Sequence, residues 1–130
     1  MILGRLPRRD ATIDFTDASG WAETLVPGLG VDRFSVRWSG QFLAPATANY
    51  TFYTTSDDGV RLSIDGQALI NNWTDHAPTV NSLTVGLDAG EFYPIVLEFY
   101  ENAGGAVISL EYEAPGVGIP RQIVPADRVY

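Results

Sequence analysis

The chain contains no cysteine and no lysine, and it has no long apolar run. Without cysteine it has no disulfide framework, no thiolate metal site and no cysteine nucleophile. No apolar stretch approaches the roughly 18 residues that a membrane-spanning helix needs, so we expect no membrane insertion. Arginine supplies all the fixed positive charge, and the formal net charge is -8. Because binding to nucleic acids depends mostly on neutralising phosphates, this charge argues against a nucleic-acid partner.

The sequence carries the pattern of an all-β protein. Its 130 residues, 45% of them hydrophobic, suit one domain with one core. Three Trp, six Tyr and six Phe favour strands over a helical bundle. Apolar residues alternate with polar ones in several short segments, and no segment shows a helical period. We therefore predict a single antiparallel β-sandwich or barrel. The alternating segments are FSVRWSGQF, NYTFYTT, VRLSI, LTVGL, YPIVLEFY and VISLEYE.

Local signals also predict how some of these strands connect. The stretch IDGQ, residues 64–67, places Asp-Gly between apolar runs and predicts a two-residue hairpin. The segments 93–100 and 108–113 are expected to pair as a second hairpin through the loop ENAGGA, residues 101–106. The proline-broken tail IPRQIVPADRVY is expected to pack at a sheet edge.

No enzyme motif stands out. The sequence contains no GxSxG, GxGxxG, Walker loop or HExxH. His76 is the only histidine, and in its polar loop a capping or packing role is favoured over catalysis. Nothing selects a pair of catalytic carboxylates among the sixteen acidic residues. We predict that the chain is not an enzyme.

Two adjacent acids interrupt the strand pattern at SDDG, residues 56–59. Ser, Asp and Gly are favoured turn residues, and this local pattern by itself favours a solvated turn. However, Asp57 and Asp58 directly precede the apolar Val60, and hard oxygen ligands at this density also suit Ca²⁺. Such a site needs further ligands, and Asn102 in the ENAGGA loop could supply one.

Taken together and in order, several segments resemble the PA-fourteen domain, a module named after a region of anthrax protective antigen. They are FSVRWSGQF, YTFYTTSDDGVRLSIDG, NNWTDH, LDAGEFYPIVLEFYENAGGA and the IP of the tail. The resemblance covers residues 10–130 and implies a β-sandwich of that type. Residues 1–9 stand where the family has an aromatic-rich first strand, and we treat them as a separate N-terminal segment.

The resemblance implies a calcium site. In the sugar-binding adhesin branch, which includes the yeast flocculins, the Asp-Asp pair is joined by a cis peptide and both carboxylates face one Ca²⁺. Here those residues are Asp57 and Asp58. A later loop contributes an Asn side chain and two carbonyl groups, which correspond to Asn102 and to the carbonyls of Gly104 and Ala106.

The resemblance also implies a function. The expected function is a calcium-dependent lectin-like module that recognises vicinal diols of sugars, in an adhesin or another glycan-active protein. Asp57, Asp58, Asn102, Trp73 and His76 are the expected carbohydrate-binding residues. For Trp73 a core position is favoured over a sugar-stacking platform. We expect a monomeric module of a larger secreted protein, extracellular or at the cell surface. The alternative is a non-lectin structural or protein-binding accessory module with no glycan affinity.

Overall fold

The computed structural model describes residues 2–3, 8–9, 12–15, 34–102 and 106–130. In these residues the chain is built almost wholly from strands, with two short 3-10 turns, η1 (Pro115–Val117) and η2 (Ala126–Arg128). The strands are β1 (Ile2–Leu3), β2 (Arg8–Arg9), β3 (Asp14–Phe15), β4 (Phe34–Leu43), β5 (Ala48–Asp57), β6 (Gly59–Ile64), β7 (Gln67–Asn72), β8 (Thr79–Leu87), β9 (Phe92–Glu101), β10 (Val107–Ala114) and β11 (Ile119–Ile123).

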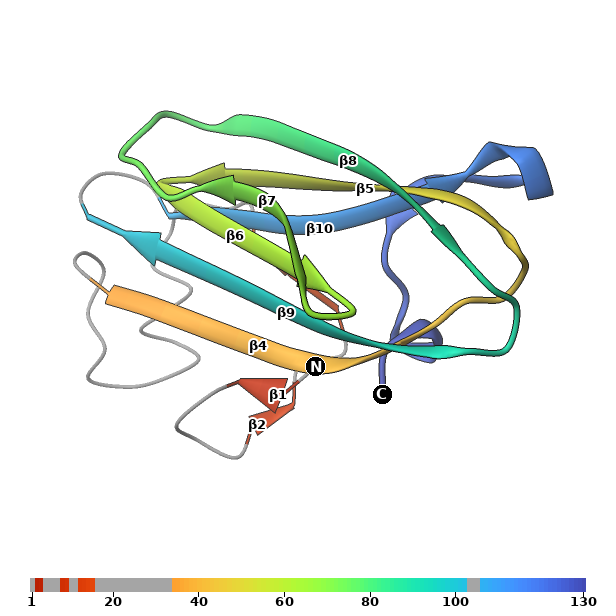
Figure 1. The fold of residues 1–130 in the computed structure, drawn as a ribbon. Helices are drawn as coiled ribbons and strands as arrows, with labels where there is room; N and C mark the ends of the chain where they lie inside the picture. The colour runs from red at the N-terminus through yellow and green to blue at the C-terminus, as the bar shows by residue number, and fades with distance from the viewer. Residues whose placement is uncertain (1, 4–7, 10–11, 16–33, 103–105) are drawn as a thin grey trace.

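The strands form two sheets that face each other (Figure 1). One sheet has the order β2-β1-β4-β9-β6-β7, and the other has the order β11-β10-β5-β8, with β3 also paired to β10. Each pairing that links named strands is antiparallel. The predicted antiparallel β-sandwich is therefore confirmed.

The core lies between the sheets, because successive side chains of a strand point to opposite faces. Along β6 the buried residues are Val60, Leu62 and Ile64, as the alternation predicts. Four rings from three strands pack edge-to-face or stacked at one end of the core, with centroids 5.2–6.3 Å apart. These rings belong to Phe42, Tyr50, Phe52 and Tyr112.

Several local predictions are confirmed. β6 and β7 form the expected hairpin, and its turn residues Asp65 and Gly66 have φ of 55° and 78°. These left-handed conformations explain the Asp-Gly pair, since both residue types adopt positive φ more readily than most. The tail supplies β11, which lies at the edge of its sheet as expected.

The predicted hairpin between residues 93–100 and 108–113 is wrong. β9 pairs with β4 and β6 in one sheet, whereas β10 pairs with β3, β5 and β11 in the other. The chain between them crosses the sandwich instead of turning back. Alternating apolar residues show that each strand has one buried face, and this is equally true of a hairpin and of two facing sheets.

Three such crossings occur at the same end of the sandwich (Figure 1). The chain changes sheet between β5 and β6, between β7 and β8, and between β9 and β10. Residues far apart in the sequence therefore meet at this end. They include the Asp-Asp pair, the segment around His76 and the end of β9.

Candidate metal centre

Asp57 and Asp58 lie where the chain leaves one sheet for the other. Along β5 the alternate residues Tyr50, Phe52, Thr54 and Ser56 face the core and are fully buried. The next peptide, between Asp57 and Asp58, is cis, as the resemblance implied, and that prediction is confirmed. Asp58 is 5% exposed, and β6 begins at the following residue.

A third carboxylate, which the sequence analysis missed, belongs to Glu101. It ends β9 and continues the inward row of Ile95, Leu97 and Phe99, so it is only 1% exposed. The signal was present in the sequence, because a glutamate in register with a core-facing row must either be buried or break the strand.

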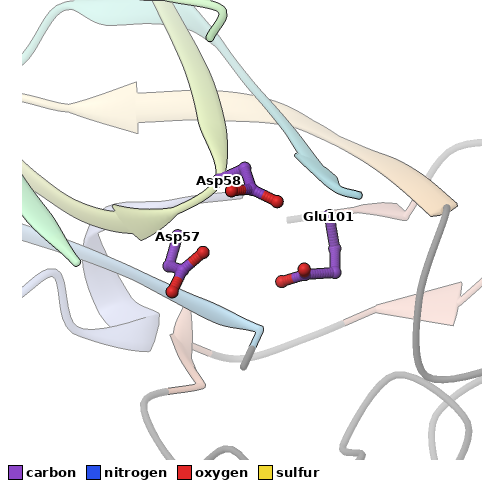
Figure 2. A group of neighbouring side chains, drawn as sticks. All are labelled: Asp57, Asp58 and Glu101. Carbon is purple, nitrogen blue, oxygen red and sulfur yellow. The ribbon is translucent and has the colours of Figure 1, made fainter. Parts of the chain in front are cut away.

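The three carboxylates converge (Figure 2). One oxygen from each of Asp57, Asp58 and Glu101 lies within 4.8 Å of the other two. The side chains come from the end of β5, from the crossing that follows it and from the end of β9, and they point toward a common space. Oxygen ligands in this arrangement suit a hard divalent cation.

The ionisation of Asp57 reflects this crowding. Its pKa lies above the usual value for an aspartate, first because burial disfavours the charged form and then because the negative charge of Asp58 repels a second one. A cation placed among these carboxylates would act in the opposite direction and favour ionised Asp57.

Asp58 is held by two backbone donors from different connections. The N–H of His76 donates to its Oδ1 over 3.2 Å, and the N–H of Asn102 donates to its Oδ2 over 2.8 Å. Each carboxylate oxygen has more than one acceptor site, so these bonds orient the group and still leave capacity for a cation.

Asp75 forms a second bridge between the same two connections. Its Oδ1 accepts a hydrogen bond from the Tyr100 hydroxyl over 2.7 Å, and its Oδ2 accepts one from the Asn102 side-chain amide over 2.9 Å. These bonds, that of Tyr100 first, lower the pKa of Asp75. Burial and then the Asp75 partner raise the pKa of Tyr100 to about 12. Sequence analysis did not single out Asp75.

Trp73 lies near this group but outside the core. Its ring is half-buried, with the Arg61 guanidinium 3.8 Å from the ring centroid and the Tyr100 ring 4.8 Å away. The favoured core position for Trp73 is therefore wrong. A large aromatic in a sequence of strands does suit a core, but Trp73 follows the last residue of β7, where the inward alternation has already ended.

The structure describes some of the remaining predicted site residues and not others. His76 binds Asp58 through its backbone, and its Nδ1 lies at hydrogen-bond distance, 2.7 Å, from the Ala77 carbonyl oxygen. Ala106 is buried immediately before β10. Gly104 lies outside the described residues. The carboxylate pair, Asn102 and His76 are thus brought to one end of the sandwich.

Comparison with known proteins identifies the family. The family model for the PA14 domain matches residues 9–124. The chain belongs to the PA14 domain family. The expectation from the sequence segments is thereby confirmed, and the fold of this PA14 domain is the one that the resemblance implied.

The similar proteins include anti-sigma factors. Anti-sigma-I factor RsgI3 of Acetivibrio thermocellus is 36% identical over 95% of this chain, which spans 18% of that protein. A solved anti-sigma factor domain-containing protein is 35% identical with a TM-score of 0.88, and the match covers 97% of this chain and 42% of that one. Another, from Clostridium clariflavum, is 34% identical with a TM-score of 0.80, covering 96% and 41%. The chain thus spans less than half of each relative.

These relatives overturn the predicted function. The expectation of a calcium-dependent lectin in an adhesin is wrong, and the alternative of a non-lectin accessory module agrees better with anti-sigma factors at 34–36% identity. A PA14 sugar-binding domain from an RTX adhesin is 16% identical, with a TM-score of 0.66 over 77% of this chain and 55% of that one, and such likeness shows the fold alone. The segments that suggested a lectin build the fold, and one fold serves many functions.

Among the described residues no helix has the length and apolar character to cross a membrane.

Proposed function

We propose that this PA14 domain is a non-catalytic regulatory module of a longer protein of the anti-sigma-factor type. The observation that carries this proposal is the 36% identity to RsgI3 over 95% of the chain. Because the match spans 18% of that relative, the chain corresponds to one part of it. We propose that contact with the sigma factor belongs to another part.

The module is further proposed to hold Ca²⁺ at Asp57, Asp58 and Glu101. Support comes from their oxygens, one from each residue within 4.8 Å of the others, and from the burial of Asp58 and Glu101. The amide oxygen of Asn102 and the carbonyls of Gly104 and Ala106 are the remaining proposed ligands. Ca²⁺ accepts six to eight oxygens at about 2.3–2.6 Å, whereas Mg²⁺ demands a tighter octahedron, so a mixed set of this size favours Ca²⁺.

The burial of these ligands supports a structural or regulatory ion. Asp58 is 5% exposed and Glu101 is 1% exposed, so an ion between them would be enclosed largely by the protein. A third carboxylate also occupies coordination space that an outside ligand would otherwise need. The proposed role of the ion is to fix the three crossings at this end of the sandwich.

The same chemistry suggests a location. Calcium sites of extracellular modules work at about 10⁻⁴–10⁻³ M, far above the affinity range of cytosolic sensors. We place the module outside the cytoplasm as part of the same proposal.

The regulatory role is tested in the full-length protein that carries this module. Deletion of residues 9–124 is expected to change the output of a reporter driven by the cognate sigma factor by about fivefold or more, the scale of an ordinary coupling between sites. Combined Asp58→Asn and Glu101→Gln substitution is expected to produce part of that change.

Asp88→Asn is the matched control, because Asp88 is exposed in the turn before β9, at the other end of that strand. The deletion must leave the protein level unchanged, as judged by immunoblot. Unaltered reporter output after the deletion would contradict the regulatory role, and a strong calcium-dependent signal on a glycan array would contradict the non-lectin assignment.

A further inference from the structure

Asp75 joins two of the crossings that surround the carboxylate cluster. It lies in the connection between β7 and β8, and both its oxygens accept hydrogen bonds from residues at the end of β9. In return, the N–H of His76 from the same connection donates to Asp58. The β7–β8 connection therefore supplies an acceptor to the end of β9 and a donor to the crossing between β5 and β6.

Asn102 completes a closed ring made of three hydrogen bonds and the covalent link from Asp75 to His76. Its backbone N–H donates to Asp58, while its side-chain Nδ2 donates to Asp75. Asp75 precedes His76 in the chain, and His76 leads back to Asp58. Two aspartates thus fix Asn102 from two directions, and one of them belongs to the carboxylate cluster.

The contact with Asp75 also decides which way the Asn102 amide points. An ionised carboxylate only accepts hydrogen bonds, so the Asn102 NH₂ group must face Asp75 and its amide oxygen must face away. That oxygen is the atom proposed above as a cation ligand. The Tyr100 hydroxyl donates to the other oxygen of Asp75, so both oxygens of this carboxylate act as acceptors.

We propose that Asp75 is a positioning residue, which orients Asn102 and ties the β7–β8 connection to the cation site without touching the ion. This inference rests on the proposed function, because it assumes that Asp57, Asp58 and Glu101 hold a cation. It follows that cation binding and the order of residues 73–78 depend on each other, since a coupling between two sites acts equally in both directions.

The Asp75→Asn variant tests the orientation directly, because it keeps the shape and changes one acceptor into a donor. If the oxygen of the new amide accepts from Tyr100, the NH₂ group of that amide faces Asn102, which must turn its own oxygen away from the ion. If the amide takes the opposite orientation, its oxygen still accepts from Asn102, but that hydrogen bond loses its charge and weakens. Partners of metal ligands typically contribute 10–100-fold to metal affinity. We therefore expect calorimetry to show Ca²⁺ binding weakened by about 10-fold or more.

Hydrogen exchange measured by mass spectrometry supplies the second readout. In the unsubstituted domain, Ca²⁺ is expected to slow amide exchange in a peptide that covers residues 73–78. In Asp75→Asn the slowing is expected to be lost even at saturating Ca²⁺. The matched control Asp88→Asn removes the same charge from an exposed turn and is expected to leave the affinity within about twofold, the scale of a screened surface charge.

Tyr100→Phe is the second variant, should Asp75→Asn fail to fold. It keeps the ring between Gly59 and Trp73 and removes only the hydroxyl that donates to Asp75. A several-fold weaker affinity for Ca²⁺ is expected, in keeping with the loss of one hydrogen bond to a charged group.

The results that overturn the inference can be told apart. If the unsubstituted domain binds no Ca²⁺, the proposed cation site fails and the role of Asp75 fails with it. If it binds Ca²⁺ and Asp75→Asn binds equally well, only the role of Asp75 fails. A variant that melts earlier in EDTA but keeps its calcium affinity shows a merely structural role and also overturns the inference.

Discussion

Gly59 allows the Tyr100 ring to pack directly against the backbone beside the carboxylate cluster. A Cβ placed at this position would lie 1.9 Å from Cε2 and 2.5 Å from Cδ2 of that ring. The Tyr100 ring also meets Trp73, with ring centroids 4.8 Å apart, so it has little room to move. The φ of Gly59 is not among the positive values, so backbone conformation does not require glycine here. The close approach of the Tyr100 ring does.

Gly59→Ala is therefore expected to destabilise the domain by about 1–3 kcal/mol, the usual cost of forcing extra atoms into a packed site. Urea denaturation measures this loss. Gly116→Ala is the control, because no atom lies within 4 Å of a Cβ built there. If the clash with Tyr100 is the cause, Gly59→Ala should cost much less in a Tyr100→Ala background. An equal cost in both backgrounds would contradict this explanation.

The sequence predicted part of the candidate site at this scale. The SDDG stretch singled out Asp57 and Asp58 because two adjacent acids interrupt an apolar alternation. Glu101 could have been found from the same alternation, since it continues the row of Leu97 and Phe99. Asp75 carries no such signal, because its place depends on where a loop between two sheets folds back.

At the scale of strands, β5, β10 and β11 share a cross-strand group on the outer face of their sheet. The Tyr53 hydroxyl donates to Oε1 of Glu113 over 2.6 Å. The Arg121 guanidinium lies 4.0 Å from the centroid of the Tyr53 ring and pairs with Glu111 at 3.2 Å. The hydrogen bond to Glu113 is the first cause of a raised Tyr53 pKa.

This raised pKa gives a sign for the pH dependence. The Tyr53 proton is bound more tightly in the folded state than in the unfolded state. Its contribution to stability is thus complete below about pH 10, the pKa of a free tyrosine, and is lost as the pH rises through the folded value. Tyr53→Phe should be less stable than the unsubstituted domain at pH 8, and the difference should shrink above about pH 10. Urea denaturation at both pH values checks this expectation.

Thr51→Val is a control on the same strand, because the hydroxyl of Thr51 bonds to Thr84 and no titrating group is involved. Its effect on the free energy of unfolding should not depend on pH in this range. A Tyr53→Phe difference that stays constant from about pH 8 to about pH 11 would contradict the role of the Glu113 bond.

Strand existence was predictable, but strand pairing was predictable only for the local hairpin of β6 and β7. The Asp65-Gly66 hairpin was specified locally, because both turn residues need positive φ. The partner of β9 was not specified locally, because β4 and β6 reach it from distant parts of the chain. The sequence of residues 101–106 is as compatible with a hairpin turn as with a crossing between sheets. The choice depends on how the apolar faces of the two sheets pack against each other.

At the scale of the whole molecule, a cation bound only by the folded state should stabilise the domain by mass action. At a free Ca²⁺ concentration of about 100 times the dissociation constant, the gain is about 2.7 kcal/mol. For a domain of this size that corresponds to a rise in melting temperature on the order of 10 °C. Differential scanning calorimetry in Ca²⁺ and in EDTA measures the shift.

The double variant Asp58→Asn, Glu101→Gln should show no shift, and Mg²⁺ should produce a smaller shift than Ca²⁺ because it requires a tighter octahedral shell. Identical melting temperatures of the unsubstituted domain in Ca²⁺ and in EDTA would contradict the proposed cation.

The proposed function rests on comparison of the whole chain with its relatives. The sequence segments identified the PA14 family correctly, but they led to a lectin, because the adhesin branch shares the fold and the aspartate pair. The relatives at 34–36% identity are anti-sigma factors instead. The three carboxylates alone do not distinguish a lectin from a module of an anti-sigma factor, since a bound cation can serve in either.

The placement of the carboxylates also has a mechanical consequence. Asp57 ends a strand of one sheet and Glu101 ends a strand of the other, so an ion between them would fasten the two layers together. A chain without cysteine has no disulfide to serve this purpose. The ion would act as a reversible cross-link between the two sheets. The force needed to separate the sheets would then depend on the surrounding Ca²⁺ concentration.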